Sequence, residues 1–365
     1  MSRVLLLGAG HAHAALLRAL AAGRLADAEV MLVAPNLHPV YSGMLPGVVA
    51  GHYRVDEARL DFEGLARAAG ARCRRAEAAR LDPDRRIVTL SDGTETGYDF
   101  ASLNLGARAA LEQVPGAPAH AVSLKAPEEL LARIDALEPH SGQGRRIAVV
   151  GAGAAGVEIA MALAWRFRPA AQIVLYSARR EFAPPLARRI GRALDRCGVE
   201  VRADTAVARM SARSLVAADG RTDGYELVLW AAGAAPPDLL AASGLASDPQ
   251  GFVAIDAMLR SLSHPEIFAA GDCATFRERP HPRSGVYAVR QGALLGRNLR
   301  AALRGADLER YVPQRNSLRL ISCGTRYAVL DWGAIGAEGA WLWRVKDRID
   351  RRWVRGMAQS GSAGG

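Results

Sequence analysis

The chain has 365 residues, the length of about two domains. Half of the residues are hydrophobic and 23% are charged, which excludes a disordered, collagen-like or low-complexity protein. Most of the charge behind the net +10 is spread along the chain, whereas a nucleic-acid binder would gather it on one face, so we expect no nucleic-acid partner.

Four cysteines, at positions 73, 197, 273 and 323, exclude a disulfide scaffold and any Cys-x-x-Cys pair. So few cysteines are typical of a reducing compartment, and no apolar run reaches the roughly 18 residues of a membrane-spanning helix. We expect a cytoplasmic protein, either free or peripheral on the inner face of the membrane. An N-terminal signal peptide is the alternative, but His11, His13 and Arg18 interrupt its apolar core.

The chain opens with a short apolar run that ends in glycines, residues 3–10 (RVLLLGAG). We predict a buried strand that turns at Gly8 and Gly10 into a helix, the arrangement that binds a dinucleotide pyrophosphate. The motif is incomplete, because His13 stands where a third glycine is usual and Ala34 where an acid usually ends the next strand. Two histidines without a third ligand are weak evidence for a metal, so we predict no metal site.

The same pattern recurs at residues 146–153 (RIAVVGAG), and the same spacing separates Gly8 from Ala34 and Gly151 from Ser177. Hairpin signals recur as well, at residues 86–93 and 215–230. Two matched strand–helix–strand openings predict two nucleotide-binding units. The predicted fold class is therefore α/β, with two Rossmann-like dinucleotide-binding domains, the second inserted into the first, plus a short C-terminal region.

Prolines and glycines suggest where the chain passes between the units, at residues 115–118 and again at residues 248–251. We place the first unit at residues 1–115 and 252–310 and the second at residues 116–251. Residues 311–365 form the C-terminal region, whose tail at 360–365 is expected to be disordered.

The second glycine turn is complete, with Gly151, Gly153 and Gly156 followed by Glu158. The position for an acid on the ribose 2′-hydroxyl is Ser177, and two arginines follow it at 179 and 180. Without the carboxylate a 2′-phosphate is not repelled, and an arginine can pair with it. Both NADPH and NADH stay open, because the same arginines also suit a solvated loop.

Three further strands end in glycine: Gly106 after residues 103–105, Gly233 after residues 230–232, and Gly271 with Asp272 after residues 267–270. In this order the motifs resemble the two-domain flavoproteins of the pyridine nucleotide-disulfide oxidoreductase superfamily. That superfamily includes type II NADH dehydrogenases and sulfide:quinone oxidoreductases. Residues 41–47 (YSGMLPG) and 285–292 (GVYAVRQG) resemble the subfamily often fused N-terminal to selenophosphate synthetase. The resemblance covers about residues 3–357 and implies either a stand-alone member or one half of a fusion.

The resemblance implies that the first unit binds FAD and the second binds NAD(P)H. It also implies that Asp272 bonds the ribityl chain, that Glu158 lies near the nicotinamide ribose and that residues 42–46 approach the flavin ring. Ala34 lacks the acid that usually holds the FAD ribose, so that contact must come from elsewhere. The implied FAD residues are Gly8, Gly10, Ser42, Leu45, Gly106, Gly271 and Asp272. The implied NAD(P)H residues are Gly151, Gly153, Gly156, Glu158, Ser177, Arg179 and Gly233.

A dithiol relay is not expected, because residues 36–50 contain no cysteine and Cys273 is interpreted as a packing residue. We predict an FAD-dependent NAD(P)H oxidoreductase that transfers hydride directly to the flavin and passes electrons to a small acceptor. The resemblance favours a quinone, with Tyr287, Arg290 and Gln291 as candidates for the acceptor site. The alternatives are a sulfide- or selenium-linked oxidoreductase, with selenophosphate synthetase as a partner, and a non-catalytic flavin redox sensor.

Near the C-terminus, Trp341, Val345, Ile349 and Trp353 recur every four residues among arginines. The pattern predicts an amphipathic helix over residues 341–355. Such a helix either docks on an anionic membrane or packs on its own domain or on a second copy of the chain.

Overall fold

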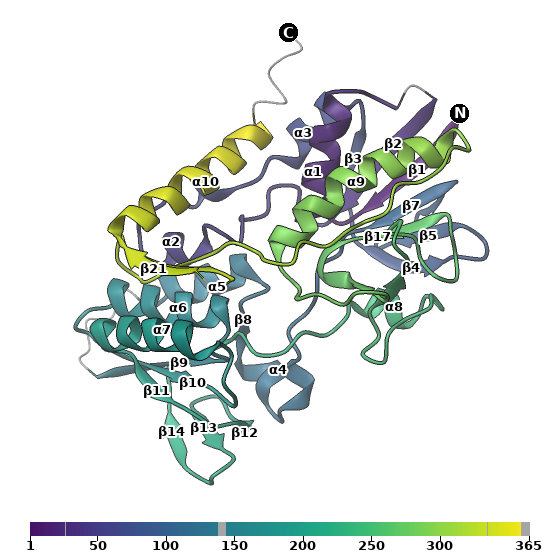
Figure 1. Ribbon diagram of the computed structural model, residues 1–365. Helices are drawn as coiled ribbons and strands as arrows, with labels where there is room; N and C mark the ends of the chain where they lie inside the picture. Colours follow the sequence, from purple (N-terminus) through teal and green to yellow (C-terminus); the bar gives the residue numbers. More distant parts are fainter. Residues whose placement is uncertain (26, 138–143, 334, 359–365) are drawn as a thin grey trace.

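A computed structural model describes residues 1–25, 27–137, 144–333 and 335–358 of the protein (Figure 1). The tail predicted at residues 360–365 lies outside the described residues. Two five-stranded parallel sheets organise the described chain, and an antiparallel hairpin region with a long helix follows them.

The first sheet has the strand order β17-β7-β1-β2-β3, with every neighbouring pair parallel. Its strands are β1 (Ser2–Leu7), β2 (Ala28–Ala34), β3 (Arg72–Arg75), β7 (Phe100–Leu103) and β17 (Ile267–Ala269). β1 is a continuous apolar run because both faces of a parallel sheet are covered, and Leu5, Leu6 and Leu7 are all buried. Helix α1 (His11–Ala21) packs between α3 (Phe62–Ala69) and α9 (Gly285–Leu303).

The second sheet has the order β11-β10-β9-β15-β8 and is also parallel. Its strands are β8 (Val122–Ser123), β9 (Arg145–Val150), β10 (Ala171–Tyr176), β11 (Glu200–Arg202) and β15 (Leu227–Trp230). Its helices are α5 (Pro127–Asp135), α6 (Ala154–Arg166) and α7 (Pro184–Cys197). All of these elements lie between β7 and β17 in the chain, so the predicted fold class, with one Rossmann-like unit inserted into another, is confirmed.

In each unit a three-stranded antiparallel meander precedes an inner strand of the parallel sheet, β7 in the first unit and β15 in the second. The first meander consists of β4 (Ala78–Asp82), β5 (Ile87–Leu90) and β6 (Glu95–Gly97), and the second of β12 (Val207–Met210), β13 (Ser214–Ala217) and β14 (Thr222–Gly224). These are the recurring hairpins expected from the sequence.

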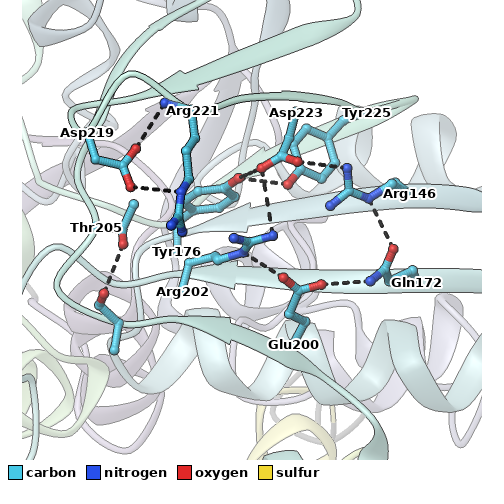
Figure 2. A network of polar contacts seen from close by, with 11 residues as sticks. Arg146, Gln172, Tyr176, Glu200, Arg202, Thr205, Asp219, Arg221, Asp223 and Tyr225 are labelled. Carbon is cyan, nitrogen blue, oxygen red and sulfur yellow. Dashed lines mark hydrogen bonds and ion pairs between the residues drawn. The ribbon is translucent and has the colours of Figure 1, made fainter.

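A polar network fastens the second meander to the sheet beside it (Figure 2). The Asp223 carboxylate accepts hydrogen bonds from Arg146 Nη1 and from the Tyr176 hydroxyl, both at 3.0 Å. The hydroxyls of Tyr176 and Tyr225 lie 2.7 Å apart, and Arg202 pairs with Glu200 at 2.6 Å. The network fixes the carboxyl ends of β10 and β11, because Tyr176 and Arg202 are the last residues of those strands.

The outward and return crossings between the sheets run side by side. Arg108 and Ala235 exchange backbone hydrogen bonds of 2.8 and 2.9 Å. Gly106 and Gly233, both with φ in the left-handed region, turn the chain into these crossings. The smaller elements around the crossings are α2 (Leu45–Val49), α4 (Ala117–His120), α8 (Asp238–Ala241), β16 (Val253–Ile255), β18 (Ala274–Phe276) and the 3-10 turns η1 (Asp56–Ala58), η2 (Leu111–Gln113) and η3 (Gly271–Cys273).

The C-terminal region forms a meander of β19 (Arg319–Ser322), β20 (Ala328–Trp332) and β21 (Ile335–Gly339), followed by α10 (Ala340–Ala358). Helix α10 packs against this meander and reaches α3 of the first unit (Figure 1). Leu342 and Met357 on its inner face are buried, whereas Trp341, Val345 and Ile349 are exposed. Trp353, the fourth residue of the sequence pattern, is partly buried instead, with its ring 6.5 Å from that of Tyr41.

Candidate cofactor and electron-transfer site

The carboxyl ends of β1, β7 and β17 meet at one buried side chain, Asn104. Its Oδ1 accepts hydrogen bonds from the backbone N–H groups of Ala12 at 3.0 Å and His13 at 3.1 Å. Its Nδ2 donates to the Ala270 carbonyl at 2.7 Å. The carboxamide therefore caps α1 and ties that helix to the strand end that carries Asp272.

Two of the predicted glycines make room for Asn104. A Cβ on Gly10 would lie 2.3 Å from Asn104 Oδ1, and a Cβ on Gly271 would lie 2.6 Å from its Nδ2. Asn104 entered the sequence analysis only within residues 103–105 and was given no role. A polar side chain at the end of an otherwise apolar strand is the feature that could have indicated one.

His13 takes the place of the third glycine without disturbing the packing of α1. The ring is buried, with Nδ1 2.6 Å from the Gly8 carbonyl and Nε2 2.8 Å from the Ser102 hydroxyl. A carbonyl only accepts, so Nδ1 carries the proton and Nε2 accepts from Ser102. Burial lowers the pKa of His13 to about 4, so the ring is neutral near pH 7. The histidine fits because the neighbouring strand offers it a small hydroxyl.

Asp272, assigned to the ribityl chain, follows β17 and pairs with Lys125, whose Nζ lies 2.7 Å from its Oδ2. The His11 ring lies beside this pair, 3.5 Å from the Ser42 hydroxyl, and burial lowers the pKa of His11. The structure therefore gathers Ser42 and Asp272 on one side of α1. Sequence reasoning did not assign Lys125 to the site, although it is one of only two lysines among 47 basic residues.

Of the three predicted acceptor residues, the structure brings two to this turn. Gln291 Oε1 accepts from the Gly271 N–H at 2.7 Å, and its Nε2 lies 3.3 Å from Nε2 of His281. The His281 ring stacks on that of Tyr287, with 4.3 Å between centroids. Arg290, one helical turn after Tyr287, is exposed, and it lies near the same group, because both Tyr287 and Arg290 act electrostatically on Tyr311, whose ring is 5.9 Å from that of His281.

At the second glycine turn the three glycines have different surroundings. A Cβ on Gly156 would lie 1.8 Å from the Gly151 carbonyl, so this glycine is needed for packing. Gly153 has φ −65° and no described protein atom within 4 Å of the position of a Cβ. Within the described residues no side chain caps α6, so its first N–H groups and this open space together fit a pyrophosphate.

The end of β10 carries the residues expected at the adenosine ribose. The Ser177 hydroxyl donates to the Arg179 carbonyl at 2.8 Å, and Arg179 pairs with Glu181 at 2.9 Å on the surface. Arg202, the nearest arginine of the next strand, is already engaged by Glu200 (Figure 2). A 2′-phosphate would therefore meet Arg179 and Arg180, with Glu181 as the group that it displaces.

Glu158 contacts the C-terminal region. Its Oε1 accepts hydrogen bonds from the Ser322 N–H at 2.8 Å and the Ser322 hydroxyl at 2.9 Å. Burial raises the pKa of the Glu158 carboxyl, and the nearby Lys346 ammonium opposes that rise.

Lys346 and Asp350 of α10 complete this cluster of buried ionisable groups. Lys346 Nζ lies 2.9 Å from Asp350 Oδ2 and donates to the Gly43 carbonyl at 2.8 Å. Their side chains are only 14% and 7% exposed. Burial raises the pKa of Asp350, which also hydrogen-bonds to Tyr41. Two acids that share one lysine next to residues 42–46 form a site able to hold a proton. Sequence reasoning did not assign Lys346, the second of the two lysines, to the site either.

The cysteines take no part in this site as thiolates. Cys273 is buried, and its Sγ donates to the carbonyls of Leu103 and Ala270 at 3.5 and 3.4 Å. Burial raises the pKa of its thiol to about 11, so it is protonated near neutral pH. Cys197 and Cys323 meet at the end of β19, where Cys197 Sγ donates to the Cys323 carbonyl at 3.3 Å. Cys323 follows Ser322, and burial raises the pKa of both thiols, that of Cys323 to about 12, so they too are protonated near neutral pH.

Two parallel sheets, each opening with a glycine turn at the start of a helix, define a two-domain dinucleotide-dependent oxidoreductase. The chain belongs to the pyridine nucleotide-disulphide oxidoreductase family, whose sequence profile matches residues 2–292. FAD and NAD(P)H are the cofactors of this family of oxidoreductases, and the residues present fit both.

Relatives of known name extend the comparison. The chain is 28% identical over 330 residues to demethylphylloquinone reductase NdbB of Synechocystis sp., covering 85% of this chain and 81% of the relative. It is 35% identical over 205 residues to the nitric oxide reductase FlRd-NAD(+) reductase of Aeromonas salmonicida. That match covers 54% of this chain and half the length of the reductase.

Solved structures share the fold. NDH2 from Plasmodium falciparum, in complex with NADH, has a TM-score of 0.82 at 14% sequence identity. The match covers 100% of this chain and 99% of the NDH2 chain. The sulfide:quinone oxidoreductase from Aquifex aeolicus has a TM-score of 0.81 at 14% identity, covering 99% and 92%.

Gly153→Val tests the nicotinamide turn. The new side chain meets open space in the protein but occupies the place of the pyrophosphate, so reduction of the flavin by NAD(P)H should slow by about tenfold or more. FAD content and melting temperature should stay unchanged. Gly191→Val, at an equally open glycine of α7, is the matched control. Loss of FAD with retained reduction by NAD(P)H would mean that the two units are assigned in reverse.

Asp272→Ala tests the ribityl contact. Loss of a charged hydrogen-bond acceptor should weaken FAD binding by about 1.5–3 kcal/mol, measured as the fraction of FAD retained on dilution. Asp307→Ala, at an exposed acid far along the chain, should retain FAD. Full FAD occupancy in Asp272→Ala would reject the assignment of Asp272.

Proposed function

We propose that the protein carries electrons from NAD(P)H through FAD to a quinone. FAD, when bound, accepts a hydride from NAD(P)H and passes two electrons on. The protein positions the two cofactors, with Gly153 and the α6 N-terminus at the nicotinamide dinucleotide and Asp272 with Lys125 at the flavin. The net reaction is NAD(P)H + H⁺ + quinone → NAD(P)⁺ + quinol, so the acceptor site must also supply protons.

The buried cluster of Glu158, Lys346 and Asp350 is the observation that carries this proposal. It adjoins residues 42–46, which are expected at the flavin ring, through the contact of Lys346 with the Gly43 carbonyl. Carboxyls with raised pKa values beside one ammonium can hold a proton and release it to a reduced acceptor. Hydride transfer from NAD(P)H to FAD alone needs no such group.

The activities named for two of the compared proteins support a quinone. One is a demethylphylloquinone reductase and the other a sulfide:quinone oxidoreductase. The sulfide- or selenium-linked alternative is less well supported, because a thiolate beside the flavin is the group it would use and the Cys273 thiol has a pKa of about 11. A non-catalytic sensor would have no need of the open nicotinamide turn at Gly153.

We also propose that the outer face of α10 docks on an anionic membrane, where a quinone would dissolve. Trp341, Val345 and Ile349 on this face are 56%, 40% and 46% exposed, and Trp332 and Ile335 of the preceding meander are exposed as well. The exposed arginines of the helix are Arg344, Arg348, Arg352 and Arg355. No helix of the described chain combines the length and apolarity needed to cross a bilayer. The surface suits interfacial contact, with apolar rings among cations.

The acceptor is tested by stopped-flow spectroscopy without oxygen. NADPH and NADH are each expected to bleach the flavin, because Ser177 leaves room for the 2′-phosphate. A short-chain ubiquinone or menadione should then reoxidise the flavin and restore its oxidised spectrum, at a rate sufficient for steady-state turnover. Cystine and polysulfide are the comparison acceptors. Reoxidation by polysulfide or disulfide but not by either quinone would reject the proposed function.

The membrane surface is tested by sedimentation with vesicles of phosphatidylglycerol and phosphatidylcholine. Binding should fall as salt rises, since exposed charges are screened within about 10 Å at 0.1 M. The triple variant Trp341→Ser, Val345→Ser, Ile349→Ser should lose binding yet keep its melting temperature. Val201→Ser with Leu262→Ser, at apolar residues exposed elsewhere, is the control. Equal binding of both variants would contradict the assignment of this face.

A further inference from the structure

The first nucleotide turn lacks the acid that ordinarily binds a ribose. β2 ends at Ala34, which is buried and carries no polar side chain. In a dinucleotide-binding unit the adenosine ribose lies at the carboxyl end of this strand, where an Asp or Glu accepts its hydroxyls. A carboxylate is nevertheless present next to this strand end, and it comes from the other unit.

That carboxylate belongs to Glu128, in the first turn of α5. Asn36, two residues beyond the end of β2, donates from Nδ2 to Glu128 Oε1 at 2.8 Å. Asn36 Oδ1 accepts from the His38 N–H at 2.9 Å, which fixes the orientation of the amide. Asn36 lies two residues beyond Ala34, at most about 7 Å along the chain, so its contact places Glu128 beside the loop that follows β2.

An arginine supports the same carboxylate. Arg59 Nη1 lies 3.7 Å from Glu128 Oε1 and donates to the His38 carbonyl at 2.5 Å. Both described contacts fall on Oε1, so Oε2 stays available to a ligand. The Glu128 side chain is 45% exposed, which leaves it accessible.

We propose that Glu128 supplies the carboxylate that binds the adenosine ribose of FAD, with Asn36 and Arg59 as its positioning residues. The assignment rests on FAD as the cofactor of the first unit and does not depend on the identity of the acceptor. A ribose has two vicinal hydroxyls, both donors, and a carboxylate oxygen accepts them as the usual acid of this position does.

The proposal gives one segment of the second unit two contacts with the cofactor of the first. Lys125 pairs with Asp272 at the ribityl end, and Glu128, three residues further along the chain, lies at the ribose end. FAD would then bridge the two units at their junction, because both contacts lie between β8 and the body of α5. Retention of FAD should accordingly depend on how residues 125–128 are held.

The test is the affinity of the apoprotein for FAD, measured by fluorescence quenching of the flavin. Glu128→Gln should raise the Kd for FAD about tenfold or more, because the amide replaces a charged acceptor. Glu129→Gln, at the exposed neighbouring acid of the same helix turn, is the matched control. Glu77→Gln tests another acid near this edge, which follows β3. Both should leave the Kd unchanged.

Truncated ligands separate ribose recognition from a structural role. ADP keeps the adenosine ribose and FMN lacks it. Glu128→Gln should therefore weaken the binding of ADP, measured by competition with FAD, and leave the affinity for FMN unchanged. The melting temperature of the apoprotein should not change. Equal losses for FMN and ADP, or a lower melting temperature with unchanged ADP affinity, would show that Glu128 only joins the two units. Loss in Glu77→Gln with none in Glu128→Gln would assign the ribose to Glu77.

Discussion

The carboxamide of Asn104 holds the first nucleotide site together, since from the end of β7 it satisfies backbone groups of both α1 and the turn after β17. Its oxygen caps α1 through Ala12 and His13, and its nitrogen bonds the carbonyl that precedes Gly271. An unpaired buried amide would cost about 1–3 kcal/mol, so all three segments are held in one arrangement. The positions of Asp272, Gln291 and His11 follow from that arrangement, because each lies on a segment that Asn104 or Gly271 fixes.

Helix α10 joins the chemistry of the site to the surface. Its inner face places Lys346 and Asp350 beside Glu158 and the Gly43 carbonyl, and its outer face exposes Trp341 and arginines. The two readings of the amphipathic pattern, packing on its own domain and docking on a membrane, are therefore compatible on opposite faces of one helix. Because the inner face is part of the ionic cluster, removal of the whole helix would disturb the proton-holding groups as well as the surface.

The basic residues divide by chemistry as well as by position. Arginine supplies almost all of the positive charge, in surface pairs such as those with Asp92 and Glu338, yet both lysines lie at the proposed flavin site. An ammonium is a compact point charge that can fit between two acids, whereas a guanidinium is a wide planar fork. Lysine can also lose its proton, which arginine does not do in proteins. These differences account for lysine at positions 125 and 346 in an otherwise arginine-rich chain.

The sequence by itself determined the two glycine turns, their strands and helices and the inserted topology. Local backbone requirements and the spacing of apolar residues carry that information. It also identified Asp272, Gly153 and Ser177 as ligand-side positions, which stay predictions. Only the tertiary structure decided which side chains meet: Asn36 with Glu128, Lys125 with Asp272, and Glu158 with Ser322. These partners lie from 92 to 164 residues apart in the chain. Their contacts depend on how the inserted unit and α10 return to the first sheet, and no local pattern encodes that return.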